Sequence, residues 1–458
     1  MDNQNKPVEL QEPLEELARD PKRFHHDLAF PPPEKIRVYD DTLRDGEQMP
    51  GVAITPKDKY ELARELSDIG VHVMDVGFPS VSEGERETLR LVLEGKKRGE
   101  IRPDLEVVCM MRSTRGDIDA TMRVIDQLGY QRDEVTYFIF TSASDLHVKY
   151  KLGKTLLRRD GIPESEWLEL PVSYYREANI RMMCEAIRYA REQGATSIEF
   201  GGEDGSRADV DYIGEIHREG LKAGGTRPST PDTVGCYSPF AVREYIPAIK
   251  AAAPDAPLVV HFHNDLGLGA WNTVMALGSG AEVFTTSVNG IGERTGNAAM
   301  HQVVLQLRYL FGIEIPGFKY DKLRALARRL ERVSGVPVQP TEPGIGLNVF
   351  SHESGIHTAG MLIHPAIYQF IPPSDLGAEI TYVYGKHSGT LVIEHALRGA
   401  GIRPEPQLVA NVLNEVKRVR EERAERGGDG FFRDYYDHLN RMGLTADEVV
   451  DIAKALSA

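Results

Sequence analysis

Residues 258–288 read LVVHFHNDLGLGAWNTVMALGSGAEVFTTSV, and this stretch decides the fold class of the chain. The apolar runs Leu258–His263 and Val283–Val288 have the length and composition of buried strands. Between them, residues 267–279 place apolar side chains at helical spacing. A strand, a helix and a second strand in this order form the repeating unit of a parallel sheet that is covered by helices.

The same alternation recurs from residue 36 to residue 311. Further strands are expected at Ile36–Asp41, Val71–Val76, Leu105–Met111, Glu134–Phe140 and Ser197–Gly201, and further helices at 56–69, 82–99, 117–128, 174–193, 208–223, 239–252 and 300–311. One strand is missing, and Arg227–Thr233 occupies its place, although Pro228 and Pro231 are unfavourable inside a strand. With it, eight strand–helix units predict an α/β fold, a (β/α)8 TIM barrel. A doubly wound open sheet is the alternative, but no G-x-G-x-x-G motif follows the first strand.

The barrel is expected to be one of four segments. They are an N-terminal extension at 1–34, the barrel at 35–315, a linker with a small subdomain at 316–390, and a mostly helical C-terminal appendage at 391–458. Helices beyond the barrel are expected near 320–334, 389–399, 407–426, 431–442 and 446–457. Within the barrel, Ser144–Tyr174 is long for a connection between a strand and a helix. Long connections of this kind often form active-site structure in barrels.

The composition of the chain limits its partners and its compartment. Asp and Glu total 69 against 54 Lys and Arg, a net charge of -15, which argues against a nucleic-acid partner. No apolar run is long enough to span a bilayer, and the first 35 residues lack the apolar segment of a secretory signal. The 3 cysteines are far apart, as is typical of a reducing compartment. We therefore expect a cytoplasmic protein with neither a nucleic-acid nor a membrane partner.

Two histidines end the strand Leu258–His263. Strand geometry places His261 and His263 on one face and Phe262 on the other. Carboxyl ends of barrel strands face the active site, and Asn264 and Asp265 continue the polar character of this one. Packed histidines in the core or on the surface are the alternative explanation of such a pair.

A second polar cluster, DDTLRDGEQ at Asp40–Gln48, ends the first strand. It could be a solvated turn, or Arg44 could hold an anion beside Asp45 as a metal ligand. Two imidazoles and a carboxylate that leave coordination positions open suit a divalent metal that binds a chelating oxygen substrate.

Asp40–Gln48 resembles the D-T-T-L-R-D-G-E-Q signature of the acyltransferase family that contains 2-isopropylmalate, homocitrate and citramalate synthases. Later segments resemble the same family in the same order, up to about residue 390: Val76–Pro79, Glu203-Asp204, Asp232–Gly235, His261–Asp265, Asn289–Asn297, Ser354–His357 and Gly385–Gly389. The chain departs from the family pattern at Asp41, where threonine is usual, and at Asp75, where glutamate is common.

The resemblance implies a Claisen-type condensation of acetyl-CoA with a 2-oxo acid and water, which gives a 2-hydroxy-2-carboxymethyl acid and CoA. It implies a divalent metal ion (Mg, Mn, Co or Zn) and a homodimer. The implied metal ligands are Asp45, His261, His263 and Asn297; the implied catalytic residues are Arg44, Glu203, His357 and Tyr368; the implied substrate-binding residues are Gln48, Arg112, His147 and Thr233. Oxaloacetate, 2-oxoglutarate, pyruvate and 2-oxoisovalerate all fit this set.

Several of these residues have a purely structural explanation as an alternative, and the activity has rivals. Glu203 could be an exposed loop glutamate, Thr233 a helix N-cap and Tyr368 a core residue. A metal-dependent carbon–carbon lyase or aldolase on the same barrel is the rival enzyme class, and a non-catalytic, metal-stabilised binding protein is the rival of another kind. The residues that follow Gly389 are too few for the mixed α/β regulatory domain of many relatives, so we expect weak inhibition by leucine or lysine, or none.

Overall fold

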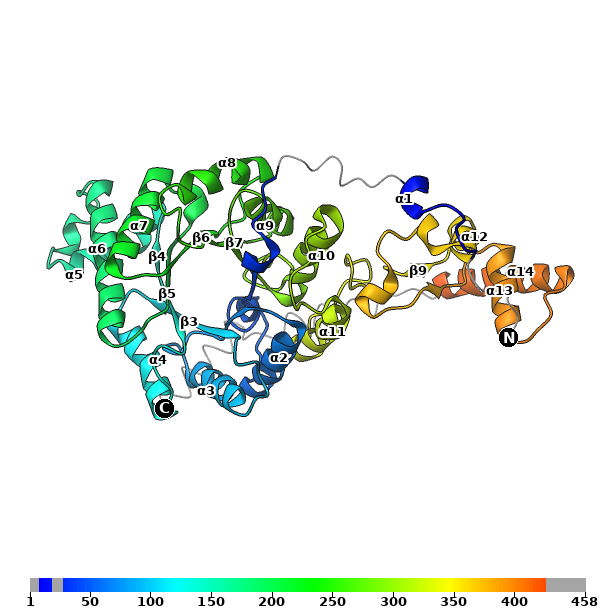
Figure 1. The fold of residues 1–458 in the computed structure, drawn as a ribbon, viewed down its shortest axis with the longest axis horizontal. Helices are drawn as coiled ribbons and strands as arrows, with labels where there is room; N and C mark the ends of the chain where they lie inside the picture. The colour runs from blue at the N-terminus through cyan, green and yellow to red at the C-terminus, as the bar shows by residue number, and fades with distance from the viewer. Residues whose placement is uncertain (1–7, 19–27, 426–458) are drawn as a thin grey trace. The chain divides into compact units, whose positions relative to one another are not determined.

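The computed structural model describes residues 8–18 and 28–425, and its larger unit contains a closed parallel barrel (Figure 1). The strands are β1 (Arg37–Asp40), β2 (Val73–Asp75), β3 (Glu106–Arg112), β4 (Thr136–Ser142), β5 (Ile198–Glu203), β6 (Arg227–Asp232), β7 (Val259–Phe262) and β8 (Val283–Thr286). Strands adjacent in sequence are adjacent in the barrel, and β8 pairs with β1 to close it. The predicted TIM barrel is confirmed, and the open sheet is excluded.

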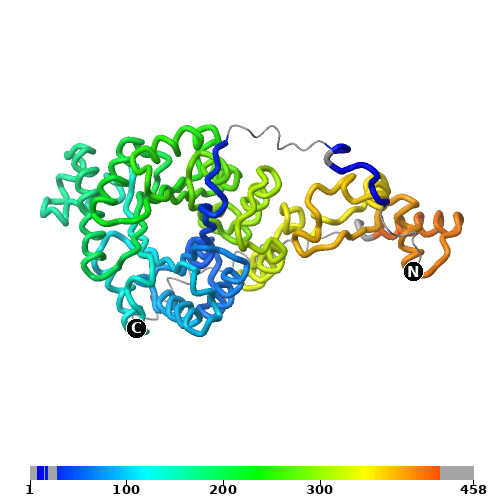
Figure 2. Tube along the Cα trace, in the orientation of Figure 1, coloured from blue at the N-terminus to red at the C-terminus, as the bar shows by residue number. Residues whose placement is uncertain are grey.

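A helix follows each strand and covers the outside of the barrel, as the chain trace in Figure 2 shows. These helices are α2 (Pro56–Ile69), α3 (Glu83–Lys97), α4 (Arg115–Gln127), α6 (Val172–Glu192), α7 (Val210–Ala223), α8 (Pro239–Lys250), α9 (Gly269–Leu277) and α10 (Met300–Phe311). Each predicted helix end lies within 2 residues of the observed one. Local chemistry sets the ends of α2: the Thr55 side chain accepts from Asp58 N–H at the start, and Gly70 ends the helix at a φ of 108°.

β6 forms despite its two prolines. It pairs with β5 through Arg227–Ser229 and with β7 through Ser229–Asp232. Each proline removes one N–H donor, and the remaining residues keep both neighbours in register. The weak strand propensity of this segment is therefore overridden by its two paired neighbours.

The connection between β4 and α6 is folded on itself. It contains a π-helical turn at His147–Lys151, the helix α5 (Gly153–Arg159) and a 3-10 turn at Glu164–Glu166. The Trp167 indole N–H donates to Lys149 O at 2.6 Å, and the Tyr175 hydroxyl donates to Trp167 O at 2.5 Å. These bonds fix the π-helical turn, which begins at the carboxyl-end side of the barrel after β4.

The described residues form two units by their internal contacts. Residues 28–319 and 326–335 make up the barrel unit, and residues 8–18, 320–325 and 336–425 make up the second unit. The second unit contains α1 (Leu14–Leu17), α12 (Gly355–Ile363), α13 (Thr390–Gly399), α14 (Pro406–Glu425) and the parallel pair β9 (Ser351–His352) and β10 (Thr381–Tyr382); α11 (Leu323–Ser334) contributes to both units. The mostly helical C-terminal appendage is confirmed. The helices expected at 431–442 and 446–457 lie outside the described residues. Among the helices described, none has the length and apolar content that crossing a membrane requires.

Candidate active site

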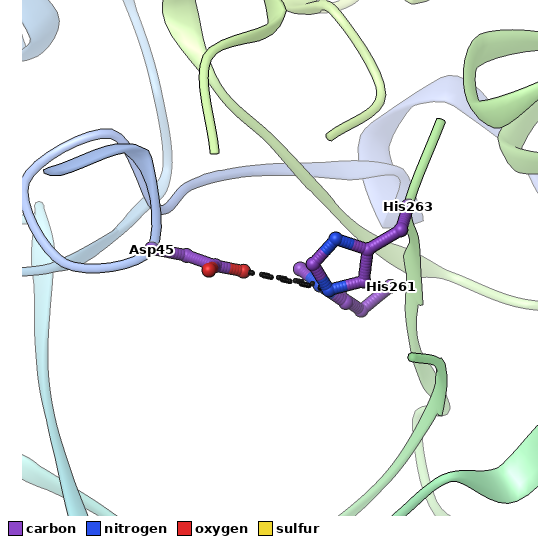
Figure 3. Close-up of side chains that lie close together, drawn as sticks. All are labelled: Asp45, His261 and His263. Carbon is purple, nitrogen blue, oxygen red and sulfur yellow. Dashed lines mark hydrogen bonds and ion pairs between the residues drawn. The ribbon is translucent and has the colours of Figure 1, made fainter. Parts of the chain in front are cut away.

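Asp45, His261 and His263 meet at the carboxyl ends of β1 and β7, and Figure 3 shows the aspartate facing both imidazoles. Asp45 Oδ2 lies 3.2 Å from His261 Nε2 and 3.9 Å from His263 Nε2, and the two Nε2 atoms are 3.1 Å apart. Ligand atoms about 2.1 Å from a common ion are roughly 3.0–3.4 Å from one another. All three side chains are buried. Two of the three distances lie in this range and the Asp45–His263 distance is longer, so a single divalent ion fits the cluster after a small movement of one side chain.

Asn297 contacts this cluster. Its amide group donates to Asp45 Oδ2 at 3.1 Å and to Asp41 Oδ1 at 3.3 Å. Its own Oδ1 is buried and has no hydrogen-bond partner among the described residues. Buried polar atoms are almost always satisfied. The nitrogen of this amide, not its oxygen, faces Asp45, so Asn297 could serve as a further oxygen ligand only after a half-turn of its amide group.

The two histidines have opposite pKa shifts. Burial disfavours the charged form of His261, but hydrogen bonds to Asp41 and Asp45 outweigh it and raise its pKa to about 9. Burial and the positive charge of His261 lower the pKa of His263 to about 3. Although burial opposes it, Arg44 and His261 hold the pKa of Asp45 well below its usual range. Near neutral pH His261 thus carries a second ring proton, and metal binding would displace this proton.

Arg44 is fixed between two carboxylates. Its Nε donates to Asp75 Oδ2 at 2.6 Å, and its Nη1 is 3.5 Å from Asp45 Oδ2. Burial raises the pKa of Asp75 to about 6, although Arg44 opposes this shift. Asp75, the departure from the common glutamate, therefore determines where the guanidinium points.

A cavity of about 280 Å³ lies beside the cluster. Residues predicted for the site that line it are Arg44, Asp45, Gln48, Glu203, Thr233, His261 and His263. Its apolar wall includes Phe78, from the motif Val76–Pro79, and Tyr39, Met110, Phe138 and Phe140, which no motif indicated. One cavity thus holds the metal-ligand candidates, charged groups and apolar surface, as small-molecule sites generally do.

Glu203 and Thr233 occupy defined positions at this cavity. Glu203 ends β5 and forms an ion pair with Lys151 of the π-helical turn. His147, on the same turn, has its Nδ1 3.8 Å from Glu203 Oε2. Thr233 Oγ1 accepts from Asp204 N–H at 2.8 Å, whereas Ser238 caps α8, so Thr233 is not the N-cap of that helix.

Other predicted residues lie elsewhere. Arg112 ends β3, its guanidinium forms two hydrogen bonds with Asp117, at 2.7 and 2.9 Å, and it does not line the cavity. His357 lies on α12 of the second unit, exposed, with its ring centroid 4.3 Å from that of Tyr368. Tyr368 is 43% exposed, so it is not a core residue.

Several charged residues of the cavity, Lys151 and Glu199 among them, were not among the predicted site residues. Lys151 lies in the long connection that was expected to form active-site structure, but nothing in its spacing singled it out. Glu199 lies on β5 four residues before Glu203, so it shares the inward face by strand periodicity. This strand periodicity could have identified Glu199 as a residue that faces the cavity.

A protein-family model described as HMGL-like matches residues 35–159 and 162–329. The chain belongs to the HMGL-like family. A second model, described as a homocitrate synthase post-HMGL domain-like region, matches residues 345–424 of this HMGL-like chain.

Curated relatives of this HMGL-like chain carry the names of condensing enzymes. Homocitrate synthase AksA of Methanopyrus kandleri is 36% identical over 85% of this chain and 89% of its own length. A probable 2-isopropylmalate synthase of Ignicoccus hospitalis is 37% identical over 84% of this chain and 88% of its own length. A putative (R)-citramalate synthase CimA of M. kandleri is 37% identical over 85% of this chain and 69% of its own length. The family predicted from the motifs is confirmed.

Among solved structures, the HMG-CoA lyase of Bacillus subtilis superposes with a TM-score of 0.50 and 21% identity, over 68% of this chain and 97% of the lyase. This likeness shows a shared fold.

Proposed function

We propose that the chain condenses acetyl-CoA with a 2-oxo acid and water to a 2-hydroxy-2-carboxymethyl acid and CoA. The observation that carries the proposal is the cluster of Asp45, His261 and His263 in the wall of a cavity that also contains Arg44 and Glu203. The synthase names of the relatives support the same reaction class.

Asp45, His261 and His263, with the Asn297 amide oxygen, would hold a divalent cation such as Mg, Mn, Co or Zn. When bound, such a cation supplies Lewis acidity to the keto and carboxylate oxygens of the 2-oxo acid. Mixed nitrogen and oxygen donors suit several of these ions, and the family is metal-dependent.

Arg44 is assigned to the keto oxygen, which gains negative charge when the neighbouring carbon is attacked. Because Asp75 fixes the guanidinium, its remaining N–H groups need no reorganisation during the reaction. Gln48 and Thr233 line the same cavity and are assigned to the carboxylate of the 2-oxo acid. Arg112 and His147 stay predictions from the resemblance.

Glu203 and His357 are assigned to the proton of the acetyl methyl group. Removal of that proton gives an enolate, whose carbon forms the new bond to the keto carbon. Water then cleaves the thioester and releases CoA as the free thiol. Glu203 lines the cavity, and the resemblance adds His357 and Tyr368 of the second unit.

The assay that tests this function measures thiol release from acetyl-CoA with oxaloacetate, 2-oxoglutarate, pyruvate and 2-oxoisovalerate. Thiol release that depends on one of these acids is the expected result. Cleavage of a hydroxyacyl-CoA without any thiol release would favour the lyase class, and no turnover with any substrate would favour a binding protein.

Replacement of Lys151 by methionine should lower kcat about tenfold and leave KM for the 2-oxo acid nearly unchanged. The Lys151 ammonium holds the Glu203 carboxylate at the cavity, so its loss leaves the proposed base without a partner. Lys151→Arg should restore most of the turnover because it keeps the charge. Steady-state kinetics on folded protein check this.

Lys154→Met is the matched control, since this lysine of α5 pairs with Glu164 at 3.6 Å and does not line the cavity. Its kinetics should equal those of the parent. Equal kcat values in Lys151→Met and the parent would show that Lys151 has no role in holding Glu203 for the reaction.

The homodimer and the cytoplasmic location also stay predictions. Sedimentation of the purified chain with its metal tests the first, and fractionation of the source cells tests the second.

A further inference from the structure

Lys59 is a buried lysine that does not line the cavity. It belongs to the first turn of α2, and it is 2% exposed. The positive end of the helix dipole disfavours a cation in this turn, and a buried ammonium group needs anionic partners. The helix itself therefore gains nothing from a lysine at this position, and its role lies in the groups that it binds.

Two carboxylates from different segments bind the Lys59 ammonium group. Its Nζ lies 2.6 Å from Glu47 Oε2 and 2.5 Å from Glu85 Oε1. Glu47 belongs to the loop between β1 and α2, and Glu85 belongs to the first turn of α3. Both carboxylates are largely withdrawn from solvent, at 23% and 15% exposed. One cation thus compensates two anions that would otherwise repel each other.

Each carboxylate uses its second oxygen to hold the backbone of a loop. Glu47 Oε1 accepts from Ile54 N–H at 2.7 Å, within the loop after β1. Glu85 Oε2 accepts from Phe78 N–H at 2.8 Å, in the loop after β2. Gly77 makes room for this contact, because its φ is 131° and a Cβ there would overlap Glu85 Oε2. The lysine and its two carboxylates therefore connect the loops after β1 and β2.

The same two loops carry the groups that hold Arg44. Asp45, in the loop after β1, lies 3.5 Å from Arg44 Nη1. Asp75 ends β2, and its Oδ2 accepts from Arg44 Nε at 2.6 Å. Its Oδ1 accepts from Gly77 N–H at 3.2 Å, beside the residue that Glu85 holds. The position of the guanidinium relative to Asp45 therefore depends on the spacing of the two loops.

Strand pairing does not fix this spacing. The pairing of β1 with β2 extends only as far as Asp40 on β1. In the part of the chain that the structure describes, no backbone hydrogen bond joins residues 41–55 to residues 76–82. Two side chains connect these segments: Arg44, which lines the cavity, and Lys59, which lies behind it on α2. The spacing of the loops is therefore determined by side chains.

We infer that Lys59 is a positioning residue, which fixes the spacing of the two loops and thereby the direction of the Arg44 guanidinium. The inference rests on the proposed function, in which Arg44 stabilises the charge on the keto oxygen, and it adds a residue that touches neither substrate nor ion. A displacement of about 1 Å in a reacting group can cost about a hundredfold in rate. Lys59 therefore affects turnover through Arg44.

Lys59→Met removes the charge and keeps a long apolar side chain. In the thiol-release assay at saturating metal, its kcat per folded molecule should fall about a hundredfold, and KM for the 2-oxo acid should change far less. Lys59→Arg should restore most of the turnover, because its guanidinium can keep both ion pairs. A loss of less than about tenfold in Lys59→Met overturns the inference.

Lys250→Met is the matched control for a role in stability alone. Lys250 ends α8 and donates to both carboxylate oxygens of Glu282, at 2.6 and 2.8 Å. Glu282 directly precedes β8, so this ion pair lies at the amino ends of the strands, away from the site. The control should lose thermal stability and keep the kcat of the parent. An equal loss of kcat in both variants would assign the effect to stability and overturn the inference.

Glu47→Gln breaks the same connection without leaving a buried charge unpaired, so it serves if Lys59→Met does not fold. Lys59 keeps Glu85, and the new amide oxygen can still accept from Ile54 N–H. Its kcat should fall about tenfold, and the double variant with Lys59→Met should be no slower than Lys59→Met alone, because both act through one connection. Parental kcat in Glu47→Gln, or losses that multiply in the double variant, would contradict the inference.

Calorimetric titration of the metal-free protein with Mn²⁺ separates this inference from the proposed function. Because Asp45 belongs to the loop that Glu47 holds, Lys59→Met should bind the ion about tenfold more weakly, whereas Lys250→Met should bind it as the parent does. A parent without thiol release for any 2-oxo acid overturns the proposed function, and the titration then still decides whether Lys59 positions the loop. Thiol release by the parent with unchanged kcat and Mn²⁺ affinity in Lys59→Met overturns the inference alone.

Discussion

Asp45→Asn should abolish tight binding of a divalent cation and lower turnover by about a thousandfold or more. The substitution removes the anionic member of a cluster whose other members, His261, His263 and Asn297, would bind a metal as neutral donors. Metal-ion catalysis contributes several kcal/mol, and 1.4 kcal/mol corresponds to about a tenfold rate change. Arg44 also loses a carboxylate that lies 3.5 Å from its Nη1. Exhaustive chelation of the parent should have the same effect, and added Mg, Mn, Co or Zn should reverse at least part of it.

Elemental analysis and metal-dependent thermal shifts measure this binding without reference to turnover. Asp265→Asn is the control, because this carboxylate follows His263 closely in sequence but pairs with Arg294 at 2.8 Å. It should keep the metal affinity of the parent. Metal bound equally by Asp45→Asn and the parent would contradict the assigned ligand, and full activity in chelated parent enzyme would contradict the metal requirement.

Periodicity predicted the barrel because its signals are local. The run Leu258–His263 is apolar through the strand and polar at its carboxyl end, and this pattern identifies both the strand and the end that faces the site. β6 shows the limit of this reasoning. Pro228 and Pro231 argue against a strand locally, and only the count of strands in a closed barrel required one there.

The metal cluster was predictable for the same reason. His261 and His263 share a face by strand geometry, and Asp45 follows a strand whose end meets the same rim. Arg112 shows what was not predictable: it ends β3 at this rim, but Asp117, five residues later, binds its guanidinium. The strand pattern predicts where the backbone of such a residue lies. Which group its side chain binds depends on residues that only the folded structure brings close.

Glu199 shows the same limit inside the barrel. Strand periodicity places it inward, where apolar residues are expected, and a lone buried glutamate there is costly. In the structure its partner is Arg227 on β6. The two residues are 28 positions apart in the sequence, and no local pattern predicts that they pair. The sequence therefore predicted the strands but not the ion pairs between them.

His357→Ala should lower kcat by roughly 10²–10⁴-fold and change the affinity for the 2-oxo acid far less. The resemblance assigns His357 to proton movement at the acetyl methyl group, whereas the 2-oxo acid is assigned to the cluster of Asp45, His261 and His263 in the barrel unit. The imidazole is exposed and packs against Tyr368 with the two rings tilted, so its loss leaves no cavity in a core. Turnover should therefore fall without loss of folded protein.

The matched control is His395→Ala, which removes another imidazole of the second unit that packs against a tyrosine, Tyr382, at 5.5 Å. It should keep the kcat of the parent. Exchange of the acetyl-CoA methyl protons with solvent deuterium, in the presence of an unreactive 2-oxo acid analogue, isolates the proton step and should be lost in His357→Ala alone. A kcat loss below about tenfold, counted per folded molecule, would mean that His357 only packs against Tyr368 and that Glu203 carries the proton transfer without it.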